Sequence, residues 1–175
     1  MYVGVDLSHG PAGTSRRHST VAVVASVDAI PIRYLKEMYT QYRPDSAAGE
    51  SWETIVKMKD IMKSLIQQYK ELQDYPPSAI VIYRDGISTS EFDTIFKSEL
   101  TAIREACVEL STAYRPYLTY IVVNKRHHTR FYPTNSDENV EAGTVVDSPD
   151  ITNPTTYDFF LNSHHVDKKK VHKII

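Results

Sequence analysis

Two aspartates of this sequence stand where short apolar segments give way to loop residues. Asp6 ends "YVGVD" and Asp85 follows "AIVIYR", and both segments have the β-branched and aromatic composition of buried strands. Ligands and catalytic groups gather beyond the carboxyl ends of strands in open α/β sheets. Two carboxylates side by side repel each other unless a cation lies between them. Their oxygen atoms suit Mg²⁺ or Mn²⁺, which can activate a water and stabilise the leaving oxygen of a phosphodiester.

A third carboxylate would complete such a site. Glu50 and Glu53 lie near the start of a helix that apolar residues at steps of three and four predict for 51–72. Each candidate also has a plainer interpretation. An Asp at the end of a strand is commonly a turn residue, as Asp85 before Gly86 would be, and a Glu at a helix N-terminus interacts favourably with the helix dipole. Spacing alone leaves both interpretations open.

A basic and aromatic segment, "NKRHHTRFYP", follows a further apolar stretch. Its cationic side chains are Lys125, Arg126, His127, His128 and Arg130. Cations beside aromatic rings suit contact with phosphates and stacking on single-stranded nucleic acid, although a solvated charge run has the same composition. His164, near a cationic tail, is equally ambiguous by itself. Zinc is disfavoured because the two adjacent histidines lack a cysteine partner: Cys107 falls on the apolar stripe of a helix.

The order of the elements predicts how these residues are positioned. A meander of three strands comes first, and the second of them does not alternate and is therefore expected to be buried on both faces. The second helix opens with a capping box formed by Ser88 and Glu91. The expected strands are 2–7, 20–28, 33–43, 79–83 and 118–123, with shorter ones in "TVVD" and "TYDFFLNSHH" and helices at 51–72 and from 88 onward. Three strands followed by helix, strand, helix and strand predict an α/β fold, a mixed sheet with helices packed on it.

Bulk composition narrows the class of protein. The 175 residues suffice for one domain or part of one, and the formal net charge of −2 gives no overall attraction to nucleic acid. One cysteine excludes an internal disulfide and fits a reducing compartment. The sequence has neither an apolar run of roughly 18 residues nor a signal peptide. We therefore expect no membrane partner and a cytoplasmic location, with the nucleus as the alternative.

Taken together, these segments resemble the Piwi domain of Argonaute proteins. "VGVDLSHGPAG" is similar to the first-strand motif of the family and "VIYRDGIS" to its second carboxylate motif. "AIREACVEL" and "IVVNKRHHTRFYP" closely resemble sequence segments of the family, and "TTYDFFLNSH" resembles a later strand of it. The resemblance covers nearly all of residues 2–165, which we take as a partial Piwi domain, followed by an atypical basic tail at 166–175.

The resemblance implies an RNase H-like fold and binding of a small guide RNA and its complementary target RNA in RNA-mediated gene silencing, alongside other silencing proteins. In members that cut, it implies a Mg²⁺- or Mn²⁺-dependent endoribonuclease. By motif, Asp6 and Asp85 match the catalytic, metal-binding aspartates. The apolar stripe favours Glu53 over Glu50 as the third catalytic carboxylate. Residues Lys125, Arg126 and His128 match the guide-backbone segment, and His164 matches a histidine that meets guide phosphates.

One departure from the family bears on activity. The fourth catalytic position of the family is a histidine in a Tyr-Tyr-Ala-His-like stretch, and this chain ends before it, about two-thirds through the domain. The final "HHVDKKKVHKII" does not match the family, and the PAZ and MID domains are absent from the sequence. Two expectations follow: an RNA-binding Piwi domain that cleaves guide-paired RNA, or a non-catalytic RNA-binding or interaction fragment of a truncated Argonaute paralogue.

Overall fold

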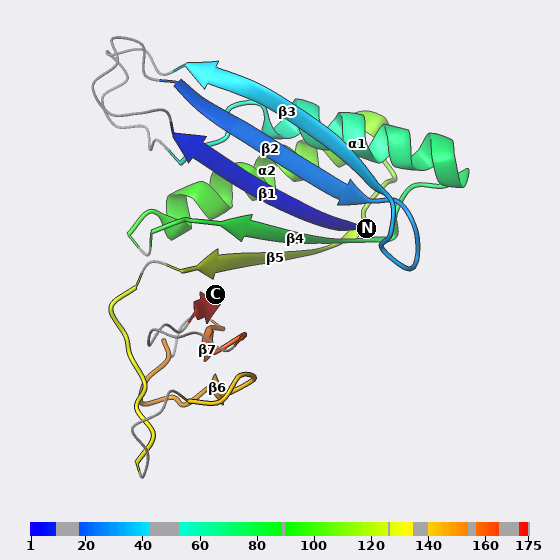
Figure 1. The fold of residues 1–175 in the computed structure, drawn as a ribbon. Coiled ribbons are helices and arrows are strands. Elements are labelled where there is room, and N and C mark those ends of the chain that lie inside the picture. Colours follow the sequence, from blue (N-terminus) through cyan, green and yellow to red (C-terminus); the bar gives the residue numbers. More distant parts are fainter. Residues whose placement is uncertain are drawn as a thin grey trace. The chain divides into compact units, whose positions relative to one another are not determined.

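The computed structural model of the chain describes residues 1–9, 18–42, 53–88, 90–125, 127–134, 140–153, 157–164 and 172–174 (Figure 1). The contacts divide the chain into two compact units, Met1–Tyr120 and Ile121–Ile175. Each unit is described by itself below. Among the described residues, no helix is both long enough and apolar enough to cross a membrane.

The first unit is built on a mixed sheet. Its strands are β1 (Tyr2–His9), β2 (His18–Ser26), β3 (Tyr34–Tyr42), β4 (Ala79–Asp85) and the first half of β5 (Tyr117–Asn124). The first three form an antiparallel meander, β4 pairs in parallel with β1, and the order across the sheet is β3-β2-β1-β4-β5. Parallel neighbours require a crossover, which a helix supplies here. The predicted order of elements is confirmed.

Helices α1 (Met58–Gln73) and α2 (Phe92–Leu110) lie together on one face of this sheet (Figure 1). Alternate residues of β1 and β4 meet the apolar stripes of both helices in one core, as the two periodicities of strand and helix require. Its fully buried members include Val3, Ile80, Ile82, Met62, Leu65 and Ile103. Cys107 belongs to this core, as expected, and burial raises the pKa of its thiol.

The prediction that β2 is buried on both faces is wrong. Its residues alternate between buried and less buried, and Val24 is 42% exposed. The reason is the placement of the helices: both described helices cover the same face, so the opposite face of β2 has no helix on it (Figure 1). A run of apolar residues in sequence did not distinguish a two-sided core from a half-covered sheet.

Helix α1 begins at Met58, later than the predicted start at residue 51. Side chains of β3 explain the difference, because they bind backbone groups just before the helix. Gln41 donates from Nε2 to the Thr54 carbonyl at 2.9 Å and accepts from the Val56 amide at 3.3 Å. The Lys57 amide donates to the Tyr39 hydroxyl at 3.1 Å. Residues 54–57 are thus held in a non-helical segment.

Helix α2 also begins after its predicted start. The helix starts at Phe92, with Glu91 as its N-cap and no side-chain cap hydrogen bond. The Ser88 hydroxyl donates to the Glu91 carboxylate at 2.6 Å, and the Glu91 amide donates to the Ser88 carbonyl at 3.1 Å. The Ser88 and Glu91 pattern lies close to the start of α2, but the predicted capping box is wrong.

The second unit continues from the end of β5 as an antiparallel ladder. There β5 pairs with β8 (His172–Ile174), β8 with β7 (Phe159–Leu161), and β7 with β6 (Val145–Val146). Residues 172–174 of the predicted basic tail form a strand. Phe160 is buried and packs edge-on against the rings of His127 and Phe131. The remaining residues of the predicted tail, 166–171 and 175, lie outside the described residues.

Candidate functional site

The parallel pairing of β1 and β4 brings the two candidate aspartates together. Its last paired residues are Val5 and Arg84, so Asp6 and Asp85 follow at the same level of neighbouring strands. Because side chains alternate along strands, both aspartates lie on the face opposite the buried Val5 and Arg84. Asp6 is exposed and Asp85 is partly buried. The sequence-based pairing of these carboxylates agrees with the register.

Asp6 does not end its strand, which corrects the expectation from sequence. Strand β1 continues to His9, which pairs with Ser19 of β2. What ends near Asp6 is the parallel partner, because β4 stops at Asp85. The carboxylates therefore lie beside the point where the chain leaves β4. Two carboxylates there fit Mg²⁺, which is commonly held by one or two carboxylates and keeps several waters.

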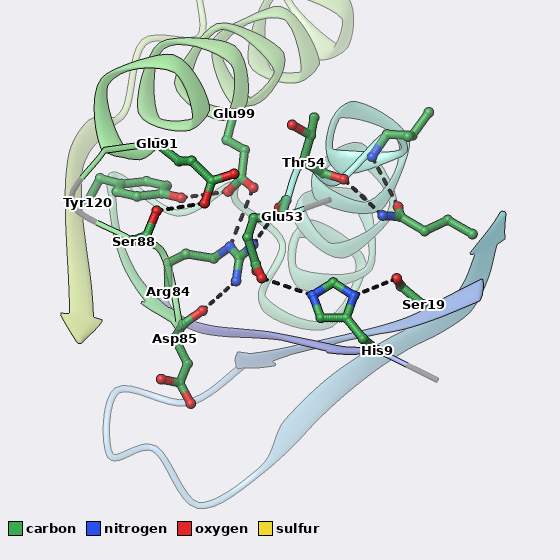
Figure 2. Close-up of polar contacts among 12 residues, drawn as sticks. His9, Ser19, Glu53, Thr54, Arg84, Asp85, Ser88, Glu91, Glu99 and Tyr120 are labelled. Carbon is green, nitrogen blue, oxygen red and sulfur yellow. Dashed lines mark hydrogen bonds and ion pairs between the residues drawn. The ribbon is translucent and has the colours of Figure 1, made fainter. Parts of the chain in front are cut away.

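Glu53, the preferred third carboxylate, is held elsewhere. It lies five residues before α1, in the non-helical segment. Its carboxylate accepts a hydrogen bond from His9 Nε2 at 2.9 Å and lies 3.7 Å from an Arg84 nitrogen (Figure 2). Among the described ranges, no set of three or more acidic, histidine or cysteine side chains is placed to hold a metal ion. Glu50 lies outside the described residues.

His9 joins Glu53 to the meander. Its Nε2 faces the Glu53 carboxylate, which can only accept when ionised, and its Nδ1 lies 2.8 Å from the Ser19 hydroxyl (Figure 2). A neutral imidazole with its proton on Nε2 satisfies both contacts, since the Ser19 hydroxyl then donates to Nδ1. The hydrogen bonds from Ser19 to His9 and from His9 to Glu53 fix the orientation of the Glu53 carboxylate.

Arg84 is the centre of the polar network behind the aspartates. Its side chain is fully buried, with 0% of its surface exposed. Nη1 donates to the Asp85 carbonyl at 2.5 Å and Nη2 to the Glu53 carbonyl at 2.7 Å (Figure 2). One guanidinium therefore binds the backbone of two candidate catalytic residues, which its rigid fork of five donors allows.

A buried carboxylate faces this guanidinium. Glu99 of α2 is 1% exposed, and its Oε1 accepts from Arg84 Nε at 3.4 Å. The Tyr120 hydroxyl donates to Glu99 Oε2 at 2.5 Å. Burial raises the pKa of Glu99, while the charge of Arg84 and the hydrogen bond from Tyr120 act in the opposite direction. Burial and the neighbouring Glu99 carboxylate raise the pKa of Tyr120.

The candidate RNA-binding residues lie in the second unit. Lys125 and His128 are exposed and follow β5, while His164 is exposed and follows β7. Both β5 and β7 pair antiparallel with β8, so they run in the same direction and these residues leave the sheet at the same end. The Ser163 hydroxyl lies 2.8 Å from His164 Nδ1. Arg126 lies outside the described residues.

Comparison with known protein families shows to which family the chain belongs. Residues 1–173 match the Piwi domain family. The chain belongs to this family. The register that places two aspartates side by side, together with the basic segment after β5, therefore lies in a Piwi domain.

Solved structures agree with this assignment. The C-terminal lobe of a budding yeast Argonaute shares 25% identity with a TM-score of 0.78, over 99% of this chain and 37% of that one. Drosophila Piwi shares 25% identity with a TM-score of 0.72, over 99% of this chain and 23% of that one. Kluyveromyces polysporus Argonaute, solved with a guide RNA, shares 22% identity with a TM-score of 0.76, over 99% and 22%. The RNase H-like α/β fold is confirmed, and the chain spans well under half of each of these proteins.

Two residues of this Piwi chain escaped the sequence reasoning. Arg84 continues the buried alternation of Ile80 and Ile82, and Glu99 falls four residues from both Ile95 and Ile103 on the stripe of α2. A charged residue in register with core positions is the signal that finds each of them, because such residues are rarely buried without a partner. Their pairing joins distant parts of the sequence, and neither local pattern contains it.

Proposed function

We propose that this Piwi chain binds a small guide RNA and its complementary target in RNA-mediated gene silencing. Membership of the family supports the proposal, as does the exposure of Lys125, His128 and His164 at one end of the strands of the second unit. Cations at such positions contact phosphate oxygens, which fixes the register of a nucleic acid without reading its sequence. Other silencing proteins as partners belong to the same proposal.

We further propose that Asp6 and Asp85 hold a divalent metal for endonucleolytic cleavage of guide-paired RNA. The observation that carries this is the parallel register, in which Val5 pairs with Arg84 and the two aspartates follow side by side. Bound Mg²⁺ would supply water activation and neutralise charge on the scissile phosphate. The two carboxylates would bind and orient the ion, and Arg84 would fix the backbone from which Asp85 projects.

A second candidate function is RNA binding without cleavage. The engagement of Glu53 with His9 and Arg84 favours it, because this carboxylate is then occupied away from the aspartates. A site with two protein carboxylates still binds metal, but its geometry is less constrained than that of a fuller set.

Cleavage separates the two candidates. The full chain is incubated with guide, end-labelled complementary RNA and Mg²⁺, beside Asp85→Asn and the control Asp93→Asn, which changes an exposed aspartate of α2. We expect a defined cut that Asp85→Asn reduces by at least about 100-fold and Asp93→Asn leaves unchanged. Binding without a metal-dependent cut would establish the second candidate and overturn cleavage.

RNA binding itself is measured across a salt series. Lys125→Ala should weaken binding and reduce the slope of log K against log salt by about 1, since one phosphate contact is lost. Lys97→Ala, an exposed lysine of α2, is the matched control. An equal response of both variants would overturn Lys125 as a phosphate contact.

A further inference from the structure

Glu99 is a carboxylate in a place that favours apolar side chains. It lies on the stripe of α2 that buries Ile95 and Ile103, and only 1% of it is exposed. Burying a charge is costly, and a buried ion pair is often no more stabilising than a hydrophobic pair of equal volume. Stability alone therefore does not account for this residue.

The contacts of Glu99 converge on the segment that carries Glu53. One carboxylate meets the Arg84 guanidinium and the Tyr120 hydroxyl. Arg84 in turn binds the Glu53 carbonyl. Glu99 thus reaches the non-helical segment through Arg84.

The segment 53–57 has few backbone bonds of its own, which makes these contacts decisive. From the other side, Gln41 and Tyr39 of β3 bind its later residues. The part nearest Glu53 is bound by Arg84, which donates to the Glu53 carbonyl at 2.7 Å. Without this bond, the end of the segment that bears Glu53 would lose this link to β4, on which Asp85 lies.

We propose that Glu99 is a positioning residue, which orients the Arg84 guanidinium so that Glu53 and Asp85 are presented by one rigid backbone frame. Its consequence for catalysis rests on the proposed cleavage, but the positioning itself does not. Arg84 links Glu99 to the site, since the same guanidinium binds the backbone carbonyls of both Glu53 and Asp85. A hydrophobic residue at position 99 would fill the space without orienting the fork.

Amide hydrogen exchange on the full chain tests this. In Glu99→Gln we expect exchange at Ile55 and Val56 to rise at least about tenfold, while the amide of Ile103 in the core of α2 changes little. Glu99→Asp, which keeps the charge on a shorter side chain, serves if Glu99→Gln does not fold, and it should loosen the same amides.

Two control variants test whether the rise in amide exchange is specific to Glu99. Tyr120→Phe removes a hydrogen bond to the same carboxylate without touching the segment, and Glu105→Gln removes a charge from an exposed position of α2. Both should leave exchange at Ile55 near the wild-type rate. A uniform rise at Ile55 and Ile103 in Glu99→Gln, or no rise at Ile55, would overturn the proposal and leave Glu99 a residue of general stability.

Cleavage gives the second readout. If the wild type cuts RNA, Glu99→Gln should lower kcat at least about tenfold while the Kd for RNA stays within about twofold, because no phosphate contact changes. A wild type that does not cut, combined with loosened amides at Ile55, would refute the proposed cleavage while upholding the positioning role. The two failures are therefore distinguishable.

Discussion

At the scale of single residues, the chemistry of the site depends on a buried guanidinium. Arg84 serves three oxygen acceptors in different directions: two backbone carbonyls and the Glu99 carboxylate. A lysine has a charge but no planar fork, and its single nitrogen cannot reach all three positions. The identity of the side chain, and not only its charge, is therefore required.

Arg84→Lys should lower the free energy of unfolding by about 3 kcal/mol, because it leaves buried acceptors without donors. Urea unfolding measures the loss. Arg104→Lys, the same change at an exposed position of α2, is the control and should stay within about 0.5 kcal/mol of the wild type. Equal effects of the two changes would show that the fork of Arg84 is not needed.

Sequence could predict some of these residues and not others. Asp6 and Asp85 were candidates because each is a carboxylate at or near the end of an apolar segment, and the resemblance to the family favoured a metal site over a turn. Arg84 and Glu99 are charged residues in otherwise apolar patterns, but their role depends on a tertiary contact between a strand and a helix, which the local sequence does not contain. Glu53 was found by resemblance, but its bond to His9 depends on how the segment before α1 is held.

At the scale of elements, that segment shows tertiary contacts overriding a helical pattern. Ile55 and Val56 continue the apolar spacing of α1, and sequence alone therefore extends the helix to them. Gln41 and Tyr39 bind the backbone there instead. A hydrogen bond from another strand cannot be read from the periodicity of the helix.

Gln41→Leu should free this segment. It removes the partners of the Thr54 carbonyl and the Val56 amide, which costs about 1–3 kcal/mol of unfolding free energy. Thermal unfolding measures this loss. Gln67→Leu is the control, since Gln67 is exposed and, within the described part of the chain, its side chain donates only to Glu71, at 3.4 Å. A loss no larger than that of Gln67→Leu would contradict the role of β3 in delaying the start of α1.

Helices α1 and α2 are also joined by a charge cluster whose strength depends on pH. Hydrogen bonds from Lys63 and Lys59 lower the pKa of Glu109 from 4.5 to about 2. A lowered pKa in the folded state means that the contribution is complete above pH 4.5 and is lost as pH falls toward 2. Solvent screens the cluster, so the effect is modest.

Glu109→Gln should therefore lower Tm slightly at pH 7 and leave it nearly unchanged near pH 2. Scanning calorimetry between these pH values measures the difference. Glu105→Gln is the control, because Glu105 meets only Lys59, at 3.9 Å, in the described ion pairs. A constant difference between Glu109→Gln and the wild type across this range would contradict the assigned contacts.

At the scale of the whole molecule, the order of strands and helices in the first unit was predictable. Each of these elements has its own hydrophobic periodicity and is bounded by loop or turn residues. The strands of the second unit are only two or three residues long. Strands were expected in "TVVD" and "TYDFFLNSHH", which contain β6 and β7, whereas β8 lies in the basic tail, which has no periodic pattern. The core cluster lies entirely within Met1–Tyr120. Stability and the proposed RNA contacts are thus assigned to different units.

A chain shortened to residues 1–124 tests this division, since it keeps β5 whole and removes Lys125, His128 and His164. Because the core is retained, we expect cooperative unfolding with a Tm within several degrees of the full chain. The affinity for guide RNA should fall at least about tenfold at low salt, while Mn²⁺ binding that depends on Asp85 should persist. Loss of cooperative unfolding would mean that the second unit is needed for the fold. Retained RNA affinity would move the phosphate contacts to the first unit.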